Sequence, residues 1–301
     1  MIKISRPGPT RQSAARRTAA VLLATAALTA LGVPATAEPP AAASAGTTVQ
    51  VSTTPERLEV VGLPCLPGEL ALTMINTGTE SRYADLFLDP TGPLQLSREI
   101  FSTWLPAADP DQPVSAPVEV RVPRDAEPGD YPITLRLDRT RLDVPVRVQP
   151  VPAKDPGSNV ALGEQATASS THGNFELCGA VDGDADSEHW DTLTGWNDGT
   201  RAAFPDTYDV ALAEPTMINK VELATLDSAH YPAKSAGLRD WDVQVRSGDG
   251  DWQTVAEVRG NEAGRVTSTF DPVRADAVRI LCLAGNDNTY SRIVELEVYG
   301  G

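Results

Sequence analysis

The feature that most constrains the fold is an alternation of apolar and polar side chains along the chain after residue 47. Val118, Val120 and Val122, for example, are separated by Glu119 and Arg121. Successive side chains of a β-strand point to opposite faces, so this period is typical of a strand with one buried face. The segment up to residue 149 shows no helical pattern. The sequence therefore predicts an all-β protein.

Short strands are predicted throughout residues 47–149, with turn residues such as Asn76-Thr-Gly78 and Pro128-Gly-Asp130 between them. They are Val49–Val51, Leu70–Met74, Tyr83–Leu88, Leu94–Leu96, Val118–Val122, Ile133–Leu137 and Val144–Val148. About seven such strands favour a two-sheet sandwich of immunoglobulin type. The Asn76-Thr-Gly78 turn and the Pro-Gly before Tyr131 also give a loose resemblance to the immunoglobulin-like modules of bacterial glycosidases and surface proteins. This resemblance implies a spacer or docking role.

The first 37 residues are expected to lie outside the fold. Five basic residues precede an apolar run from Ala19 to Leu31, which is too short to span a bilayer, and Ala35-Thr-Ala37 resembles a cleavage site. This order is typical of a secretory signal. Residues 38–46 are rich in Pro and Ala and are interpreted as a disordered spacer. We therefore expect a secreted protein that is extracellular or associated with the cell surface.

The charge of the chain restricts its partners. Of 25 basic and 41 acidic residues, 20 and 41 remain once residues 1–37 are removed, a net charge near −21. Nucleic acid and anionic membranes attract proteins through basic faces, so both are disfavoured as partners. Neutral ligands, cations and high solubility are favoured.

A second domain is predicted after residue 158. Three prolines make residues 150–158 a semi-stiff linker, and residues 159–301 again alternate. Strands are predicted at Tyr208–Leu212, Ile218–Thr225, Trp241–Arg246, Thr254–Val258, Val266–Phe270, Val278–Leu283 and Ile293–Tyr299. Long segments without a clear period, 183–206 and 227–239, lie between them, and long loops are where binding sites are commonly found.

The three cysteines leave the disulfide pattern open. Cys178 and Cys282 could pair within the second domain and leave Cys65 as a buried thiol. The alternative is that Cys178 and Cys282 stay unpaired.

The segment from Gly179 to Trp190, which we call the acidic bend, is the most chemically distinctive stretch. It holds Asp182, Asp184, Asp186 and Glu188 within a few residues. Carboxylates packed this closely repel one another, and calcium, which takes six to eight oxygen ligands, would offset the repulsion. The alternative is an Asp/Gly-rich surface turn.

Residues 159–300 resemble the discoidin family, also called coagulation factor 5/8 type C, which includes the family 32 carbohydrate-binding modules. The cues occur in the order that the family has. They are Asn159–Gly163, Ala166–Ser170, Ala180–Asp184, Ile218–Leu223, Asp249–Trp252, Phe270–Val273, Ala277–Ile280 and Glu295–Gly300. The resemblance implies a galactose-binding-like jelly-roll β-sandwich.

The resemblance also implies a structural calcium. Its expected ligands are oxygens from the acidic bend and from the closing strand: Gly179, Asp182, Asp184, Ser187, Val294 and Glu295. A cation there would fasten the bend to the last strand.

Sugars are recognised by aromatic rings together with convergent polar groups. In related modules these come from loops at one end of the sandwich. The corresponding candidates are Trp196, Asn197, Asp198, Arg201, His230, Tyr231, Asn288 and Tyr290. Trp196 could instead pack against the core, and the core interpretation is preferred for Trp190, Trp241 and Trp252. Thr289, where galactose-binding members carry Asn, leaves the sugar undetermined.

The sequence predicts a binding protein, not an enzyme. It holds no Gly-x-Ser-x-Gly elbow and no phosphate-binding glycine loop, and its three histidines lack the spacing of a transition-metal site. The expected partner is a glycan or cell-surface polysaccharide. The alternative is an extracellular scaffold that contacts an envelope protein or the cell wall.

Overall fold

The computed structural model describes residues 48–107, 112–154, 157–190 and 194–300. The expected signal and spacer, residues 1–46, lie outside the described residues. Strands dominate, as predicted, and the described chain has one short α-helix, α1 (Ala233–Ala236). No described helix has the length and apolarity needed to cross a bilayer.

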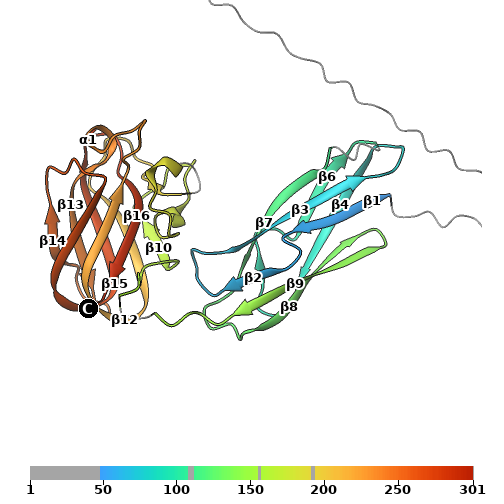
Figure 1. Ribbon diagram of the computed structural model, residues 1–301, viewed down its shortest axis with the longest axis horizontal. Helices are drawn as coiled ribbons and strands as arrows, with labels where there is room; N and C mark the ends of the chain where they lie inside the picture. Colours follow the sequence, from blue (N-terminus) through green and yellow to red (C-terminus); the bar gives the residue numbers. More distant parts are fainter. Residues whose placement is uncertain (1–47, 108–111, 155–156, 191–193, 301) are drawn as a thin grey trace, which may run out of the picture. The chain divides into compact units, whose positions relative to one another are not determined.

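The N-terminal domain is a sandwich of two sheets (Figure 1). Its strands are β1 (Val49–Thr54), β2 (Leu58–Val61), β3 (Gly68–Asn76), β4 (Arg82–Pro90), β5 (Gln95–Leu96), β6 (Ile100–Leu105), β7 (Val114–Arg121), β8 (Gly129–Leu137) and β9 (Thr140–Gln149). One sheet has the order β1-β3-β7-β5 and the other β2-β9-β8-β4-β6. The sequence did not predict β2 and β6.

Alternate residues of both sheets form one apolar core in this domain. Leu72 and Met74 of β3, Leu86 of β4 and Val118 of β7 are fully buried in it. The Tyr131 hydroxyl donates to the carbonyl of Glu127, 3.1 Å away, and so closes the corner before β8. The two-sheet sandwich agrees with the predicted fold class, and its immunoglobulin type stays a prediction.

The C-terminal domain is a second β-sandwich. Its strands are β10 (Gln165–Ala168), β11 (Trp196–Asn197), β12 (Asp206–Thr225), β13 (Leu238–Arg246), β14 (Gln253–Val258), β15 (Arg265–Gly285) and β16 (Arg292–Tyr299). They are hydrogen-bonded in the order β11-β16-β12-β15-β13-β14, and β10 pairs with β12. β12 and β15 each join two strands that were predicted separately. The pairing of β12 with β15 continues past register shifts, such as the one between Ala211 and Thr216.

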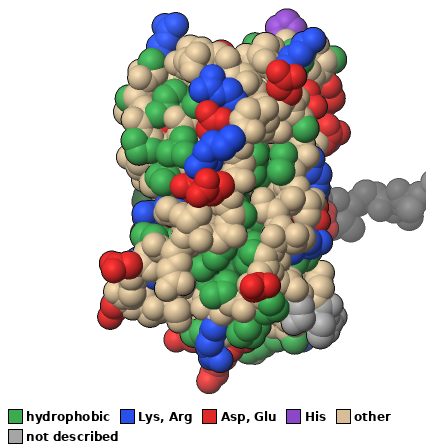
Figure 2. Space-filling model, turned by 90° about the vertical axis from the view of Figure 1, so that its left-hand side faces the viewer, with side chains coloured by type: hydrophobic (Ala, Val, Ile, Leu, Met, Phe, Trp, Pro, Cys, Tyr) green, Lys and Arg blue, Asp and Glu red, His purple; other side chains and the backbone are tan. Residues whose placement is uncertain are grey.

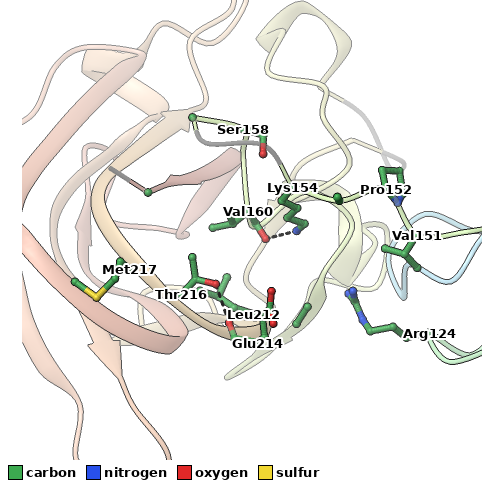
Figure 3. A pocket seen from close by; sticks show the side chains of 14 residues that line it. Arg124, Val151, Pro152, Lys154, Ser158, Val160, Leu212, Glu214, Thr216 and Met217 are labelled. Carbon is green, nitrogen blue, oxygen red and sulfur yellow. Dashed lines mark hydrogen bonds between the residues drawn. The ribbon is translucent and has the colours of Figure 1, made fainter.

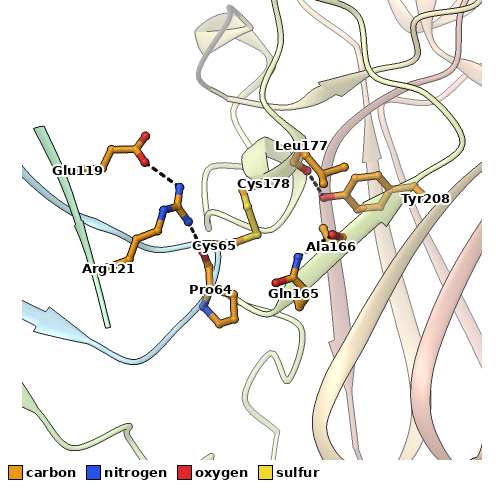
Figure 4. Close-up of a disulfide and its surroundings, with 9 residues drawn as sticks. All are labelled: Pro64, Cys65, Glu119, Arg121, Gln165, Ala166, Leu177, Cys178 and Tyr208. Carbon is orange, nitrogen blue, oxygen red and sulfur yellow. Dashed lines mark hydrogen bonds and ion pairs between the residues drawn. A yellow bond between two sulfur atoms is a disulfide. The ribbon is translucent and has the colours of Figure 1, made fainter. Parts of the chain in front are cut away.

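The disulfide corrects one sequence-based expectation. Cys65 is bonded to Cys178, and Cys282 is a buried free thiol (Figure 4). Cys282 lies in β15, where its side chain is fully buried, so the suggested Cys178–Cys282 pairing is wrong. Cys65 is itself a member of the apolar core of the C-terminal domain, and its N–H donates to the carbonyl of Gly163 at 2.9 Å.

Candidate functional site

The acidic bend is built from a chain of side-chain to backbone hydrogen bonds. Asp182 accepts from the N–H of Asp184 at 2.9 Å, Asp184 from Asp186 at 3.0 Å, and Asp186 from Glu188 at 2.9 Å. This pattern is typical of consecutive Asx turns. Gly183 adopts a φ of +94°, which side-chain-bearing residues rarely reach. The local sequence therefore fixes the path of the bend through its own carboxylates.

The bend meets the last strand at Glu295. This side chain of β16 is 1% exposed, and its Oε1 accepts from the N–H of Gly183 at 3.2 Å. Its other oxygen, Oε2, is buried without a hydrogen-bond partner among the described residues. Burial, reinforced by the charge of Asp182, raises the pKa of Glu295 to about 8. An orphaned buried carboxylate oxygen beside a second carboxylate suits a cation, so Glu295 and Asp182 are the two residues of the expected set whose chemistry fits calcium.

The other expected calcium ligands have partners of their own. The Gly179 carbonyl accepts from Gly195 at 2.6 Å, and Ser187 Oγ accepts from the N–H of Asp227 at 3.1 Å. Asp184 Oδ2 lies 2.9 Å from Nδ1 of His189. Val294 is buried in a small apolar cluster. The described residues contain no cluster of three or more His, Cys, Asp and Glu side chains arranged for a metal.

A hollow of about 470 Å³ at the loop end of the C-terminal domain holds the best ligand-binding candidates. We call it the rim hollow. Its lining residues are His172, Phe175, Trp190, Asn197, Leu226, His230, Tyr231, Ser235, Ala236, Asp287, Tyr290 and Arg292. Four of the sequence-predicted residues, Asn197, His230, Tyr231 and Tyr290, are among them.

Aromatic rings from separate loops converge in the rim hollow. The Phe175 and Trp190 centroids are 4.8 Å apart, and His172 meets Tyr290 edge-on at 6.0 Å. Tyr231 is 48% exposed. Trp190 packs against the small apolar cluster of Ala224, Leu226, Ala236 and Val294, in line with the core interpretation, and it also lines this hollow.

Arg292 and Asp287 form an oppositely charged pair among the residues that line the rim hollow. They form an ion pair at 2.8 Å, and the Arg292 guanidinium also donates to the Ala236 carbonyl at 2.7 Å and lies 5.5 Å from the Tyr290 ring centre. Burial alone would raise the pKa of Asp287, but hydrogen bonds from Thr289 and the charge of Arg292 together lower it. Arg292 was missed by the sequence reasoning because it opens a strand, directly after the loop that was searched.

The remaining predicted ligand residues lie elsewhere. Trp196 is fully buried against Tyr208, with ring centres 5.1 Å apart, and its indole N–H donates to the Ser170 carbonyl. The packing alternative is therefore correct, and Trp196 offers no face to a sugar. Asp198 is also fully buried and accepts from the N–H of Ser291 at 2.6 Å. Arg201 and Asn288 are exposed and do not line the rim hollow.

A larger cavity of about 570 Å³ is lined by Arg124, by linker residues and by the bend in β12 (Figure 3). Its two basic groups share one buried counter-ion, because Lys154 lies 2.7 Å from Glu164 and Arg124 pairs with the same carboxylate. None of its described lining residues is aromatic. The rim hollow is thus the better candidate for a sugar.

Comparison with known proteins indicates the family of the C-terminal domain. Residues 179–280 match a family model of the F5/8 type C group, described as the NedA-like, galactose-binding domain. Residues 179–280, within the C-terminal sandwich, therefore form an F5/8 type C domain. No relative was found among curated proteins.

Several solved carbohydrate-binding modules are similar to the F5/8 type C domain. Chitosan-binding module 1 of a chitosanase/glucanase from Paenibacillus sp. IK-5 is 28% identical, covering 47% of this chain and 98% of the module, with a TM-score of 0.39. The family 32 module of NanJ from C. perfringens, in complex with galactose, is 21% identical, covering 47% and 97%, with a TM-score of 0.39. A fucose-binding module from Streptococcus pneumoniae is 19% identical, covering 50% and 100%, with a TM-score of 0.42.

Proposed function

We propose that this protein is a secreted, non-catalytic, lectin-like protein that binds a glycan in the rim hollow of its F5/8 type C domain. The observation that carries the proposal is the convergence of exposed and half-buried aromatic rings on the Arg292–Asp287 pair. Aromatic faces bind the apolar face of a sugar ring, while a fixed guanidinium and carboxylate bind hydroxyl groups.

A neutral sugar fits this hollow better than a charged one. Arg292 already has the carboxylate of Asp287 as its counter-ion, so the pair as a whole is neutral. The face shown in Figure 2 has basic and acidic side chains interspersed, with no extended basic patch. The match to a galactose-binding family model makes galactosides the first ligands to test.

Catalysis would need more than this hollow provides. Glycoside hydrolysis commonly uses two carboxyl groups. Among the described residues that line the rim hollow, Asp287 is the one carboxylate, and it is held in an ion pair. This supports a binding role for the site.

The same proposal includes a structural calcium between the acidic bend and β16. Glu295 Oε2 and the carboxylate of Asp182 would supply oxygens, and the bound charge would offset the repulsion between the two carboxylates. The cation would hold together two segments that the Gly183–Glu295 hydrogen bond already joins.

Glycan-array screening of the full chain, followed by calorimetry with the soluble sugar, tests the function. Arg292→Ala should lower the affinity at least tenfold, because a charge-assisted hydrogen bond contributes about 1.5–3 kcal/mol. Arg201→Ala is the matched control and should bind like the wild type, since Arg201 lies outside the hollow. Equal losses in both variants, or no glycan bound by the wild type, would contradict the proposal. Capture of an envelope protein that free sugars do not compete would favour the scaffold alternative.

A further inference from the structure

Exposed apolar side chains gather on two neighbouring strands of the N-terminal domain. Six large hydrophobic side chains are strongly exposed among the described residues, and four of them lie on β4 and β6. These are Tyr83 at 56%, Phe87 at 43%, Ile100 at 47% and Trp104 at 60% exposed. We call these four residues the β4–β6 patch. Grouping of this kind marks an interaction surface, whereas scattered exposed residues would need no explanation.

The β4–β6 patch has a regular order. Tyr83 lies directly opposite Trp104 in the register of the two strands, and Phe87 lies opposite Ile100. Between these two apolar pairs, Ser102 donates to Asp85 at 2.5 Å. The patch therefore reads apolar, polar, apolar along the strands, and it is symmetric about Ser102.

β6 is an open edge of its sheet. Among the described strands it pairs with β4 and with no other (Figure 1). Its sequence, Ile100-Phe-Ser-Thr-Trp-Leu105, contains no charged residue and no proline. Natural edge strands commonly carry charges, prolines or bulges that prevent pairing with another chain. β6 has no charge or proline to block it.

The backbone of β6 is oriented for pairing outward. The Glu99 carbonyl accepts from the N–H of Leu88 in β4, at 2.9 Å. Backbone groups of an antiparallel strand alternate between its two neighbours, so those of Phe101, Thr103 and Leu105 face β4. The N–H and C=O groups of Ile100, Ser102 and Trp104 then face the open edge.

We propose that this edge pairs with β6 of a second copy of the chain, antiparallel and centred on Ser102. In that register Ser102 faces Ser102 of the second copy, and Ile100 faces Trp104 of the second copy, twice by symmetry. Both the outward backbone groups and the exposed apolar side chains then find partners. Cross-strand aromatic and β-branched pairs of this kind stabilise sheets.

If two copies associate, charge favours this edge over other parts of the surface. The chain carries a net charge of −16, so two copies repel each other through most of their surfaces. β6 is a neutral strand, and each Asp85, which lies between the two apolar pairs, accepts a hydrogen bond from its own Ser102. In the proposed dimer the two Asp85 side chains are three strand spacings apart, roughly 14 Å.

The other edge with a comparable sequence differs in its exposed side chains. β1 ends the second sheet and is also uncharged. Its exposed side chains, however, are the polar Gln50, Ser52 and Thr54. Pairing there would bury no apolar surface, so β1 provides a matched control strand.

The contact is small, so we expect a reversible dimer. A single strand pair with four apolar side chains from each copy falls below the roughly 1,200–2,000 Å² of standard stable interfaces. Its dissociation constant should be on the order of micromolar. Dimers should therefore form where the protein is concentrated and separate on dilution.

Cysteine cross-linking tests the register. Opposed residues of a hydrogen-bonded antiparallel pair have Cα atoms about 5.5 Å apart, within disulfide range. Ser102→Cys should therefore form a disulfide-linked dimer under mild oxidation. Ser52→Cys, an exposed serine on β1, is the matched control and should stay monomeric. Equal cross-linking of the two variants, or none at Ser102→Cys, would overturn the proposal.

Charge exchange tests the same register without a covalent bond. In sedimentation velocity, the wild type should dimerise with concentration, while Ile100→Lys and Trp104→Glu should each be monomeric. A mixture of these two variants should recover the dimer, because the new lysine faces the new glutamate. Unchanged thermal melts would confirm that each variant is folded. A wild type that stays monomeric at all concentrations, with Trp104 fluorescence that responds to a polysaccharide, would assign the patch to a glycan instead.

Discussion

Oε1 of Glu295 accepts a hydrogen bond from the backbone N–H of Gly183, which joins the last strand to a bend 112 residues earlier in the chain. The contact fixes one oxygen of a buried carboxylate and leaves the other without a partner among the described residues. Tyr208 lies nearby, fully buried, and its hydroxyl donates to the Leu177 carbonyl (Figure 4). The acidic bend, the last strand and the core thus meet at one carboxyl group.

The metal-free protein should lose stability as the pH rises. The pKa of Glu295 is about 8 in the folded chain and 4.5 ordinarily, so the folded state keeps a proton that the unfolded state has released. The stability that comes from keeping Glu295 protonated in the folded state is complete below the ordinary pKa, and it is lost as the pH rises through the folded pKa. Chemical unfolding in EDTA, at about pH 5 and at about pH 8, measures the change. Added calcium should stabilise the protein more at the higher pH, because protons then compete less for the carboxylate.

Glu295→Gln should remove both the loss of stability at higher pH and the stabilisation by calcium. The amide keeps the shape and an oxygen that can accept from Gly183, but it carries no charge. Without metal, the variant should be more stable than the wild type at about pH 8, by up to a few kcal/mol, and should resemble it at about pH 5. Calcium should give it no further stability. Glu297→Gln, on the same strand but paired with Arg265, is the control and should keep the calcium response. A variant at Glu295 that still responds fully to calcium would place the cation elsewhere.

The disulfide between Cys65 and Cys178 should contribute strongly to stability. It closes a loop with a sequence separation of 113 residues. Its removal in Cys65→Ser/Cys178→Ser should lower the free energy of unfolding by up to about 5 kcal/mol. Urea unfolding measures the loss, and peptide mapping without reductant checks the pairing. Cys282, whose pKa is raised by complete burial, should react with a thiol reagent after unfolding and not before.

Several elements of the fold follow from the sequence because one face of each strand is buried. β3 and β7 bury every second residue, and both were predicted from that period. β6 was missed because its exposed positions include Ile100 and Trp104, so its two faces are both largely apolar. The alternation of apolar and polar residues that identifies a strand is lost where the exposed face of the strand is also apolar.

The candidate sites were predicted only in part from the sequence. Resemblance placed Glu295 beside the acidic bend, and the structure brings them together. Hydropathy could not decide whether a loop tryptophan is exposed, so Trp196 was a sugar-site candidate with core packing as the alternative, and the structure buries it fully. Trp190, expected in the core, packs against a small apolar cluster and also lines the rim hollow. The spacing of three cysteines could not identify the bonded pair, because Cys65 reaches the core of the other domain.

The burial of Trp196 and the position of Tyr290 in the rim hollow predict opposite effects for two substitutions. Trp196→Ala should lower the free energy of unfolding by roughly 3–5 kcal/mol, because it leaves a cavity against Tyr208. Tyr290→Ala removes a half-buried ring from the rim hollow, so it should cost far less stability and weaken sugar binding severalfold. Thermal unfolding and calorimetry on the same preparations separate the two quantities. If Trp196→Ala stayed fully stable and lost binding, the rim hollow would not be the sugar site.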